Sequence, residues 1–368
     1  MNLDDFTSFK ILDTLDMLAE IDNLPEQLQS AWELGQRQPL PLEGPEPLQS
    51  PIHQVVLSGM GGSAIGADLL AAYLAPTCRI PVFVSRDYVL PAWVHGPETL
   101  VIASSHSGDT EETIAAFEAA RQAGCRLLVT CTGGELERRA TARSLPVWKF
   151  AHTGQPRAAV GFSFGLLLAA FSRLGFLDES PETIAQTVSD TVKIMKKGQD
   201  ALHAGVPVVK NPAKRLAGQL VGRWVNVYGS GILAPVARRW KGQLNEIAKA
   251  GAGFEILPEA DHNALAGLNN PMDIQPRTLT IFLRSPSDHP RNHLRADLTR
   301  HAFMVEGLNT DVYDAQGDFP LAHIWTALHF GDYVAYYLAM AYAVDPTPVE
   351  ALVNFKAAMK AASGNAQL

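Results

Sequence analysis

A hydroxyl-rich segment at residues 104–113 is the part of the sequence that most clearly indicates chemistry. It reads SSHSGDTEET and follows an apolar run typical of a buried strand. Hydroxyl and backbone N–H groups at the start of a helix can hold a phosphate without any lysine. The segment therefore predicts a phosphate site formed by Ser105, Ser107 and Thr110. The alternative is a turn in which Thr110 or Asp109 does no more than cap the helix.

Two Gly-x-Gly turns share one local pattern. The segments VVLSGMGGSA at 55–64 and VNVYGSGILA at 225–234 each combine a strand, two glycines and the start of a helix. Glycine permits close approach of the backbone, and a helix N-terminus attracts anions, so each turn is a candidate sugar-binding site. Both turns also match a dinucleotide fingerprint, but Asp87 is a poorly placed partner for a ribose. We favour sugar binding over a nicotinamide site or a plain tight turn.

The composition indicates a folded protein that is not a general nucleic-acid binder. The chain has 368 residues, 47% hydrophobic and 18% charged, with a formal net charge of −8. A nucleic-acid-binding protein would need a basic face. No charge-free apolar run of about 18 residues occurs, and the first residues contain no signal-peptide core, so no membrane span is expected. Three cysteines without a CxxC pattern fit reduced thiols, and a cytoplasmic location is expected.

The chemical segments lie within two series of alternating strands and helices. Short apolar runs alternate with helical stretches between residues 55 and 174, and again between 224 and 342. Such alternation predicts parallel sheets with helices on both faces. We therefore predict an α/β fold with two related lobes, each a mostly parallel sheet flanked by helices, and extra N- and C-terminal helices. The expected divisions are 1–50 for an N-terminal helix and connector, 51–178 for the first lobe with the phosphate loop, 179–205 for a connecting helix, 206–345 for the second lobe, and 346–368 for a C-terminal helix that closes the pocket.

The first glycine turn and the hydroxyl-rich segment together resemble the sugar isomerase (SIS) domain. Further runs resemble a family with two such domains, the bifunctional phosphoglucose/phosphomannose isomerases of the phosphoglucose isomerase superfamily. The resemblance spans roughly residues 50–360, and its motifs are specific in combination. The runs are QPRA at 155–158, RWKGQLNE at 239–246, DHN at 261–263, GD at 331–332 and DPTP at 345–348.

The resemblance implies a role for each residue that matches the family pattern. The reaction would interconvert glucose 6-phosphate and fructose 6-phosphate, and also mannose 6-phosphate and fructose 6-phosphate. The protein would be a homodimer in which His262 reaches the pocket of the other subunit, and it would need no cofactor and no metal. The implied catalytic residues are Glu246 as the base in the second lobe, His262, Arg157 and Lys356. The implied substrate-binding residues are Gly61, Gly62, Ser63, Ser105, Ser107, Thr110 and Thr347.

Aldose–ketose exchange explains why these residue types would be needed. One base must remove a proton and return it one carbon away, and a positioned carboxylate such as Glu246 supplies about 10²–10⁴-fold. The enediol intermediate develops negative charge, which a cation such as Arg157 would stabilise. The substrate arrives mostly as a ring, and His262 titrates in the right range to assist ring opening. The alternative for Glu246, His262 and Lys356 is that they are ordinary surface residues.

Other functions are left open by the sequence. A non-catalytic SIS module that senses a sugar phosphate would keep the hydroxyls but would not need Glu246. An SIS enzyme of amino-sugar phosphate metabolism and a nicotinamide oxidoreductase are further alternatives. His289 and His293 have a metal-binding spacing but no third ligand, so no metal site is expected. Two departures from the family pattern, Ile247 after the base and Asp109 in the phosphate loop, bear on substrate preference.

Overall fold

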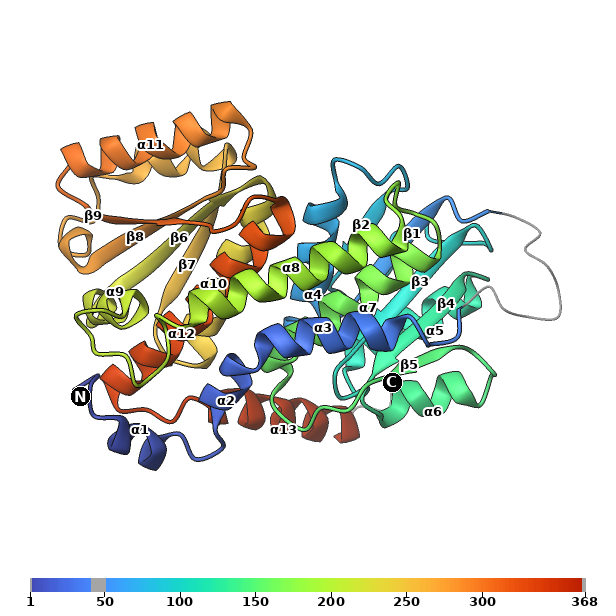
Figure 1. The fold of residues 1–368 in the computed structure, drawn as a ribbon. Helices are drawn as coiled ribbons and strands as arrows, with labels where there is room; N and C mark the ends of the chain where they lie inside the picture. The colour runs from blue at the N-terminus through green and yellow to red at the C-terminus, as the bar shows by residue number, and fades with distance from the viewer. Residues whose placement is uncertain (1, 41–50, 366–368) are drawn as a thin grey trace.

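Two parallel sheets, each covered by helices, form the framework of the chain (Figure 1). The computed structural model describes residues 2–40 and 51–365. The predicted α/β fold with two helix-flanked lobes is confirmed. Most of the expected connector at 39–51 lies outside the described residues, and the division of the chain into lobes and linking segments stays a prediction.

The first lobe is a five-stranded sheet whose side chains alternate between two apolar layers. Its elements are β1 Gln54–Ser58, α4 Gly61–Leu74, β2 Val82–Ser85, β3 Thr99–Ser104, α5 Glu111–Gln122, β4 Arg126–Cys131, α6 Gly134–Thr141, β5 Val147–Lys149, η1 Pro156–Ala158 and α7 Val160–Arg173. The strand order is β2-β1-β3-β4-β5, with every pair parallel. Leu100 and Ile102 of β3 pack in the core with α4 and α7, whereas Val101 and Ala103 pack with α5 and α6. This alternation buries both faces.

The second lobe repeats the parallel plan with four strands. Its elements are β6 Trp224–Ser230, η2 Gly231–Leu233, α10 Ala234–Glu246, β7 Ala252–Leu257, η3 Glu259–His262, η4 Ala264–Gly267, η5 Gln275–Arg277, β8 Thr278–Arg284, α11 Pro290–Val305 and β9 Asn309–Asp314. The strand order is β7-β6-β8-β9, and all pairs are parallel. Tyr228, Phe282 and Phe303 form an aromatic layer between this sheet and α11.

The remaining helices lie outside these two series. They are α1 Phe6–Leu12, α2 Met17–Asp22, α3 Leu24–Gly35, α8 Pro181–Gln199, α9 Pro212–Leu220, α12 Pro320–Tyr342 and α13 Glu350–Asn365. Of these helices, α8 and α12 connect the two lobes. Every residue of α12 from Leu321 to Met340 is buried, and one continuous core contains side chains of both lobes, α3 and α12. α8 runs across from the first lobe to the second (Figure 1).

Several element bounds differ from the sequence pattern. The single leading helix expected from the N-terminal pattern is divided into α1, α2 and α3. α1 is separated from α2 because Asp16 adopts φ +55° and the Asp13 carboxylate accepts from the N–H of Met17 at 2.8 Å. Asn23 separates α2 from α3. Helices α6 and α9 were not predicted. The pattern also extends the helix after β6 to Lys249, but α10 ends at Glu246 and Lys249 adopts φ +55°.

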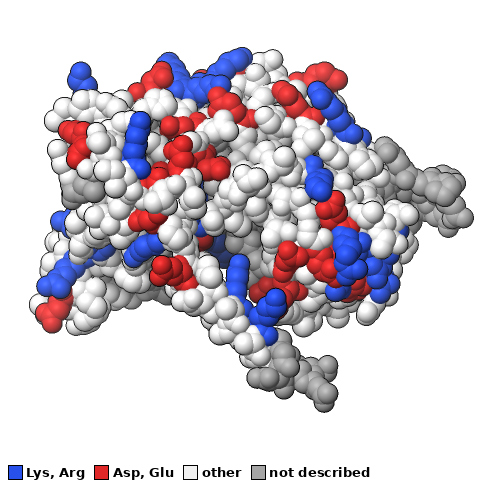
Figure 2. Space-filling model, turned by 90° about the horizontal axis from the view of Figure 1, so that it is seen from below, with Lys and Arg blue, Asp and Glu red and all other residues white. Residues whose placement is uncertain are grey.

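The described residues show neither a membrane helix nor a face of one charge sign in the view from below. Across 2–40 and 51–365, no helix combines the length and hydropathy that crossing a bilayer requires. Figure 2 shows acidic and basic side chains interspersed on the lower face.

His329 on α12 is an internal imidazole that ties this helix to α2. Its Nε2 lies 2.9 Å from the carbonyl oxygen of Ile21, and the residue is 2% exposed. Burial disfavours the charged imidazolium and so lowers the pKa of His329 to about 4.

Acid is expected to destabilise the protein through His329. An unfolded histidine takes up a proton below about pH 6.5, whereas the folded one resists protonation until about pH 4. The unfolded state binds more protons in this window, so stability is lost as the pH falls, by about 3 kcal/mol in total. As the pH falls, urea titrations should show a smaller loss of unfolding free energy for His329→Gln than for the wild type. The exposed His301→Gln variant should lose as much as the wild type. Equal pH dependence of all three proteins would refute this role.

Candidate active site

The candidate site lies where the strand order of the first sheet reverses. β1 lies between β2 and β3, so the chain crosses from one side of β1 to the other. The first glycine turn, residues 59–63, follows β1, and the hydroxyl loop, residues 105–110, follows β3. Open α/β sheets bind ligands in the crevice at such a point. The N–H of His106 donates to Ser63 Oγ at 3.2 Å and joins the two segments.

Gly61 and Gly62 are needed for steric reasons. Gly61 starts α4 with φ +51°, a left-handed conformation that other residues rarely adopt. A Cβ at Gly62 would lie 2.3 Å from the carbonyl oxygen of Pro156. The bare backbone therefore lets η1 pack directly on the turn and holds Arg157 beside it. Ser63, 4% exposed, follows on α4.

The hydroxyl loop is folded around its own hydroxyl groups. Ser105 Oγ lies 2.9 Å from Thr110 Oγ1 and accepts from the N–H of Gly108 at 3.1 Å. Ser107 is exposed, and its Oγ accepts from the N–H of Asp109 at 3.2 Å. Thr110 is the N-cap residue of α5, but its side chain makes no capping hydrogen bond. The three hydroxyls thus gather at a helix N-terminus, as a phosphate cradle requires.

Gly108 and Asp109 fasten the hydroxyl loop to α6. Gly108 has φ +76°, and a Cβ there would lie 1.9 Å from the carbonyl oxygen of Gly133. Asp109 Oδ1 accepts from the N–H of Glu135 at 2.9 Å, in the first turn of α6. The helix dipole favours an anion at that position. The aspartate that departs from the family pattern is therefore directed at a second helix N-terminus.

Arg157 and Glu246 form the charged centre of the candidate site. Arg157 on η1 has a side chain 5% exposed, whereas that of Glu246, the last residue of α10, is 33% exposed. Arg157 Nη1 lies 3.6 Å from Glu246 Oε2. Burial lowers the pKa of Arg157, and the charge of Glu246 opposes that shift. One residue from each lobe thus places an accessible carboxylate beside a buried cation.

A buried ion pair behind this centre explains two further motifs of the sequence. Arg239 Nη2 lies 2.6 Å from Asp332 Oδ2, and the two side chains are 3% and 4% exposed. The same nitrogen donates to the carbonyl oxygen of Arg157 at 3.1 Å. Gln243 Nε2 donates to the other oxygen of Asp332 at 2.9 Å. Asp332 therefore fixes α10 against α12, and Arg239 supports the backbone that carries Arg157.

The turn between α12 and α13 contacts Arg157 from the C-terminal side. Arg157 Nη2 donates to the carbonyl oxygen of Pro346 at 3.0 Å and to that of Thr347. The N–H of Thr347 donates to Asp345 Oδ1 at 2.9 Å. Within the described residues, Thr347 Oγ1 and Arg157 Nε are buried without a hydrogen-bond partner. Buried polar atoms usually have a hydrogen-bond partner, which makes these two atoms candidates for contact with a substrate.

Lys249 belongs to this centre although sequence reasoning gives it no role. Its Nζ donates to the carbonyl oxygens of Glu246 at 2.6 Å and Pro346 at 3.2 Å. Burial, and next the charge of Arg157, lower the pKa of Lys249 to about 8. A continuous helix would place this lysine on a solvated face, and only the end of α10 at Glu246 turns it toward the centre. No feature of the sequence marks that end.

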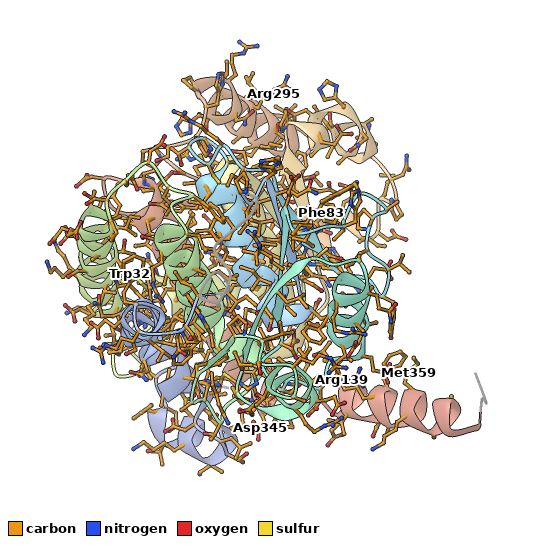
Figure 3. The ribbon with its side chains drawn as sticks, turned by 90° about the vertical axis from the view of Figure 1, so that its right-hand side faces the viewer. Trp32, Phe83, Arg139, Arg295, Asp345 and Met359 are labelled. Atoms are coloured by element: carbon orange, nitrogen blue, oxygen red, sulfur yellow. The ribbon has the colours of Figure 1, made fainter. Side chains whose placement is uncertain are left out.

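His262 and Lys356 are not joined to this centre within one chain. His262 ends η3 and is exposed, and Lys356 lies on α13, whose side chains at 350–362 are all exposed. Figure 3 shows α13 running out from the body of the chain, with Met359 on it. Among the described residues, neither side chain makes a hydrogen bond or ion pair with Arg157 or Glu246.

The second glycine turn differs from the first because a carboxylate lies against it. β6 lies between β7 and β8, so the loop after β8 corresponds to the hydroxyl loop after β3. A Cβ at Gly231 would lie 3.2 Å from Asp288 Oδ1 of that loop. Burial raises the pKa of Asp288. An ionised carboxylate there would repel a phosphate, so the first lobe is the better candidate for phosphate binding.

The histidine pair of α11 is not part of a metal cluster in the described part of the chain. No group of three or more His, Cys, Asp or Glu side chains with metal-binding geometry is found there. His289 Nδ1 instead accepts from the N–H of Arg291 at 3.1 Å and so caps α11.

Two α/β lobes, a glycine turn and hydroxyl loop at a strand-order reversal, and a carboxylate supplied by the other lobe define a protein of the SIS class. Residues 209–359 match the family described as "Bacterial phospho-glucose isomerase C-terminal SIS domain". The chain is 39% identical over 337 residues to the bifunctional phosphoglucose/phosphomannose isomerase of Caldicellulosiruptor bescii, covering 91% of this chain and 96% of that relative. It therefore belongs to the bifunctional phosphoglucose/phosphomannose isomerase family.

One further relative agrees with this membership, and one solved structure agrees with the fold. A relative of the same name from Aquifex aeolicus is 30% identical over 312 residues, covering 84% of this chain and 92% of the relative. The C-terminal domain of glucosamine-fructose-6-phosphate aminotransferase from Francisella tularensis superimposes with a TM-score of 0.66 at 15% identity, covering 90% of this chain and 98% of that structure. The latter similarity supports the two-lobe fold alone.

Proposed function

We propose that this protein interconverts glucose 6-phosphate and fructose 6-phosphate, and mannose 6-phosphate and fructose 6-phosphate, through an enediol. The observation that carries the proposal is the pair of Arg157 and Glu246, 3.6 Å apart, at an accessible position between the lobes. A sensor of sugar phosphates would need the hydroxyl loop but not a carboxylate held beside a buried cation. The names of the relatives from Caldicellulosiruptor bescii and Aquifex aeolicus support the same reaction.

In this proposal Glu246 is the base and Arg157 stabilises the intermediate. Glu246 takes the proton from C2 of the open-chain aldose and returns it to C1, while the hydroxyl proton of O2 is transferred to O1, so that the carbonyl moves from C1 to C2. Negative charge develops on the enediol oxygens, and a guanidinium in a largely dry position interacts with that charge strongly. Lys249 adds a second cation next to the backbone of the base.

The substrate phosphate is proposed to bind the hydroxyl loop through Ser105, Ser107 and Thr110. Gly61, Gly62 and Ser63 would then contact the sugar, because the N–H of His106 joins the loop to Ser63. Thr347, whose carbonyl oxygen already accepts from Arg157, would close the opposite side of the pocket.

The proposal is tested by incubating the purified protein with fructose 6-phosphate and resolving the products by NMR. Both glucose 6-phosphate and mannose 6-phosphate should form, and in D₂O they should carry deuterium at C2 from exchange at the base. Activity should survive extensive chelation. Tight binding of fructose 6-phosphate without any isomerisation would refute the proposal and favour a sensor.

We further propose a homodimer in which His262 assists ring opening in the site of the other subunit. Asp261 accepts from Arg295 at 2.9 Å and from Thr299 at 2.6 Å, so the neighbouring His262 is presented on an anchored segment although it is exposed. A catalytic histidine that, among the described residues, is not joined to Arg157 or Glu246 of its own chain fits a role across a subunit interface.

Helix α13 supports the same assembly. Leu352, Phe355 and Met359 recur at a spacing of three and four residues and are 46%, 64% and 40% exposed. An apolar helix stripe that is left exposed marks a protein interface. Lys356 lies beside Phe355, so docking of α13 would determine where its ammonium group goes, and its role in the pocket stays a prediction.

Co-expression of Glu246→Gln and His262→Ala chains should restore activity that neither variant has alone. In a mixed dimer, one of the two sites would contain Glu246 from one chain and His262 from the other. Random pairing should therefore give about one quarter of wild-type activity. Purified dimers carrying two different affinity tags make the measurement direct. Failure of the mixed dimer to regain activity would place His262 in its own chain's site, whereas normal activity of His262→Ala alone would place this residue outside the mechanism.

We also propose that the protein acts in the cytoplasm. Cys78, Cys125 and Cys131 are all free, and Cys131 is buried, as is usual for a chain that stays reduced.

A further inference from the structure

A chain of three hydrogen-bonded side chains links the hydroxyl loop to α2. His106 of the loop has its Nε2 2.9 Å from Nδ1 of His152. Nε2 of His152 lies 3.0 Å from Glu20 Oε2 on α2. The His152 side chain is 8% exposed and that of Glu20 is 28% exposed, so this chain is largely shielded from water.

The Glu20 carboxylate determines the direction of every hydrogen bond in this chain. An ionised carboxylate only accepts, so His152 carries a proton on Nε2, and in the uncharged form of this ring the other nitrogen, Nδ1, is an acceptor. His106 must then donate from Nε2. Burial, and next the neighbouring His152, lower the pKa of His106 to about 4, so this ring is uncharged near neutral pH. When both rings are uncharged, each is thereby held in one tautomer and one orientation.

The backbone of His106 transmits this orientation to the loop. Its N–H donates to Ser63 Oγ at 3.2 Å, and its carbonyl oxygen accepts from the N–H of Thr132 at 2.9 Å and from Thr132 Oγ1 at 2.8 Å. The ring also meets Phe150 edge to face, with centroids 5.9 Å apart. A displaced His106 ring would lose its contact with Phe150, and a shift of the backbone that carries the ring would move the hydroxyls of Ser105 and Ser107 on either side of it.

We propose that Glu20 is a positioning residue for the phosphate site and acts through His152 and His106 on the hydroxyl loop. The inference rests on the proposed function, in which this loop binds the substrate phosphate. Within the described residues, Glu20 makes no hydrogen bond or ion pair with Arg157 or Glu246, so the proposal assigns it an effect on binding rather than on proton transfer. The adjacent Ile21 accepts from His329 of α12, and α2 therefore ties the phosphate site to the helix that spans both lobes.

The test compares Glu20→Ala, Glu20→Gln and the control Glu33→Ala, which removes an exposed carboxylate from α3. Glu20→Ala should raise the KM for fructose 6-phosphate and the dissociation constant for inorganic phosphate by about 5–10-fold, with kcat within about twofold of the wild type. Glu20→Gln should recover most of this affinity, because its amide oxygen still accepts from His152. Glu33→Ala should match the wild type.

Ring ¹⁵N chemical shifts provide a readout that a purely structural role would not change. His106 should be the Nε2–H tautomer in the wild type and in Glu20→Gln, and a mixture of tautomers in Glu20→Ala. Unchanged phosphate binding in Glu20→Ala, a loss in kcat alone, or an equal loss in Glu33→Ala would each overturn the proposal. A wild type that binds phosphate without isomerising fructose 6-phosphate would refute the proposed function and leave the Glu20 comparison intact.

Discussion

Replacement of Glu246 by glutamine should lower kcat by about 10²-fold or more while the protein remains folded. Glutamine has the same shape but cannot accept a proton from a substrate carbon. Arg157 keeps its hydrogen bonds to the carbonyl oxygens of Pro346 and Thr347, so the buried guanidinium is not left without partners. The measurement is kcat with fructose 6-phosphate, alongside thermal unfolding of both proteins.

The exposed Glu306 at the end of α11 provides the matched control for this substitution. Glu306→Gln should leave kcat, KM and the unfolding temperature unchanged. KM of Glu246→Gln should change far less than kcat, because the base acts mainly in the transition state. Near-normal turnover by a folded Glu246→Gln would remove this residue from the mechanism.

The parts of the site that could be predicted from sequence are those that directly follow a strand predicted by its apolar residues. The apolar runs before the first glycine turn and before the hydroxyl loop predict strands, and both strands are where the pattern puts them. Because β1 and β3 are parallel neighbours, the two segments that follow them must meet at one edge. The strand order of the sheet therefore brings Ser63 and Ser105 into one crevice.

The parts that could not be predicted depend on where an element ends or on contacts between distant segments. Lys249 joins the centre only because α10 stops at Glu246, and the periodicity of the sequence continues past that point. Glu20 and His152 are 132 residues apart, and neither belongs to a motif. Asp288 resembles an ordinary loop carboxylate until the strand order of the second sheet places it against Gly231.

The resemblance to the isomerase family identifies site residues that periodicity could not identify. The structure brings some of these residues together and leaves others apart. Arg157 and Glu246 come from segments that are remote in sequence, yet they meet because Arg239 and Asp332 fix η1, α10 and α12 together. His262 is instead exposed in the single chain, so its proposed role depends on the second subunit of the proposed homodimer.

A Ser107→Ala, Thr110→Ala double variant should bind fructose 6-phosphate about 10²–10⁴-fold more weakly, because each lost hydrogen bond to a charged phosphate costs about 1.5–3 kcal/mol. The effect should fall mainly on KM, since the phosphate does not react and its contacts change little on reaching the transition state. Some loss of kcat is expected where remote binding energy orients the reacting carbons. Unphosphorylated fructose should be an equally poor substrate for both forms.

The control for the double variant lies in the corresponding loop of the second lobe. Ser287→Ala removes an exposed hydroxyl there, which contacts His323 at 2.8 Å, and it should leave KM unchanged. Thr110→Ser keeps the hydroxyl that meets Ser105 Oγ and should retain most of the affinity. Steady-state kinetics and inhibition by inorganic phosphate make the comparison. If the double variant keeps both its KM and its inhibition constant, the phosphate binds elsewhere. A phosphate held by the two hydroxyls near the start of α5 could not bind equally tightly after both are removed.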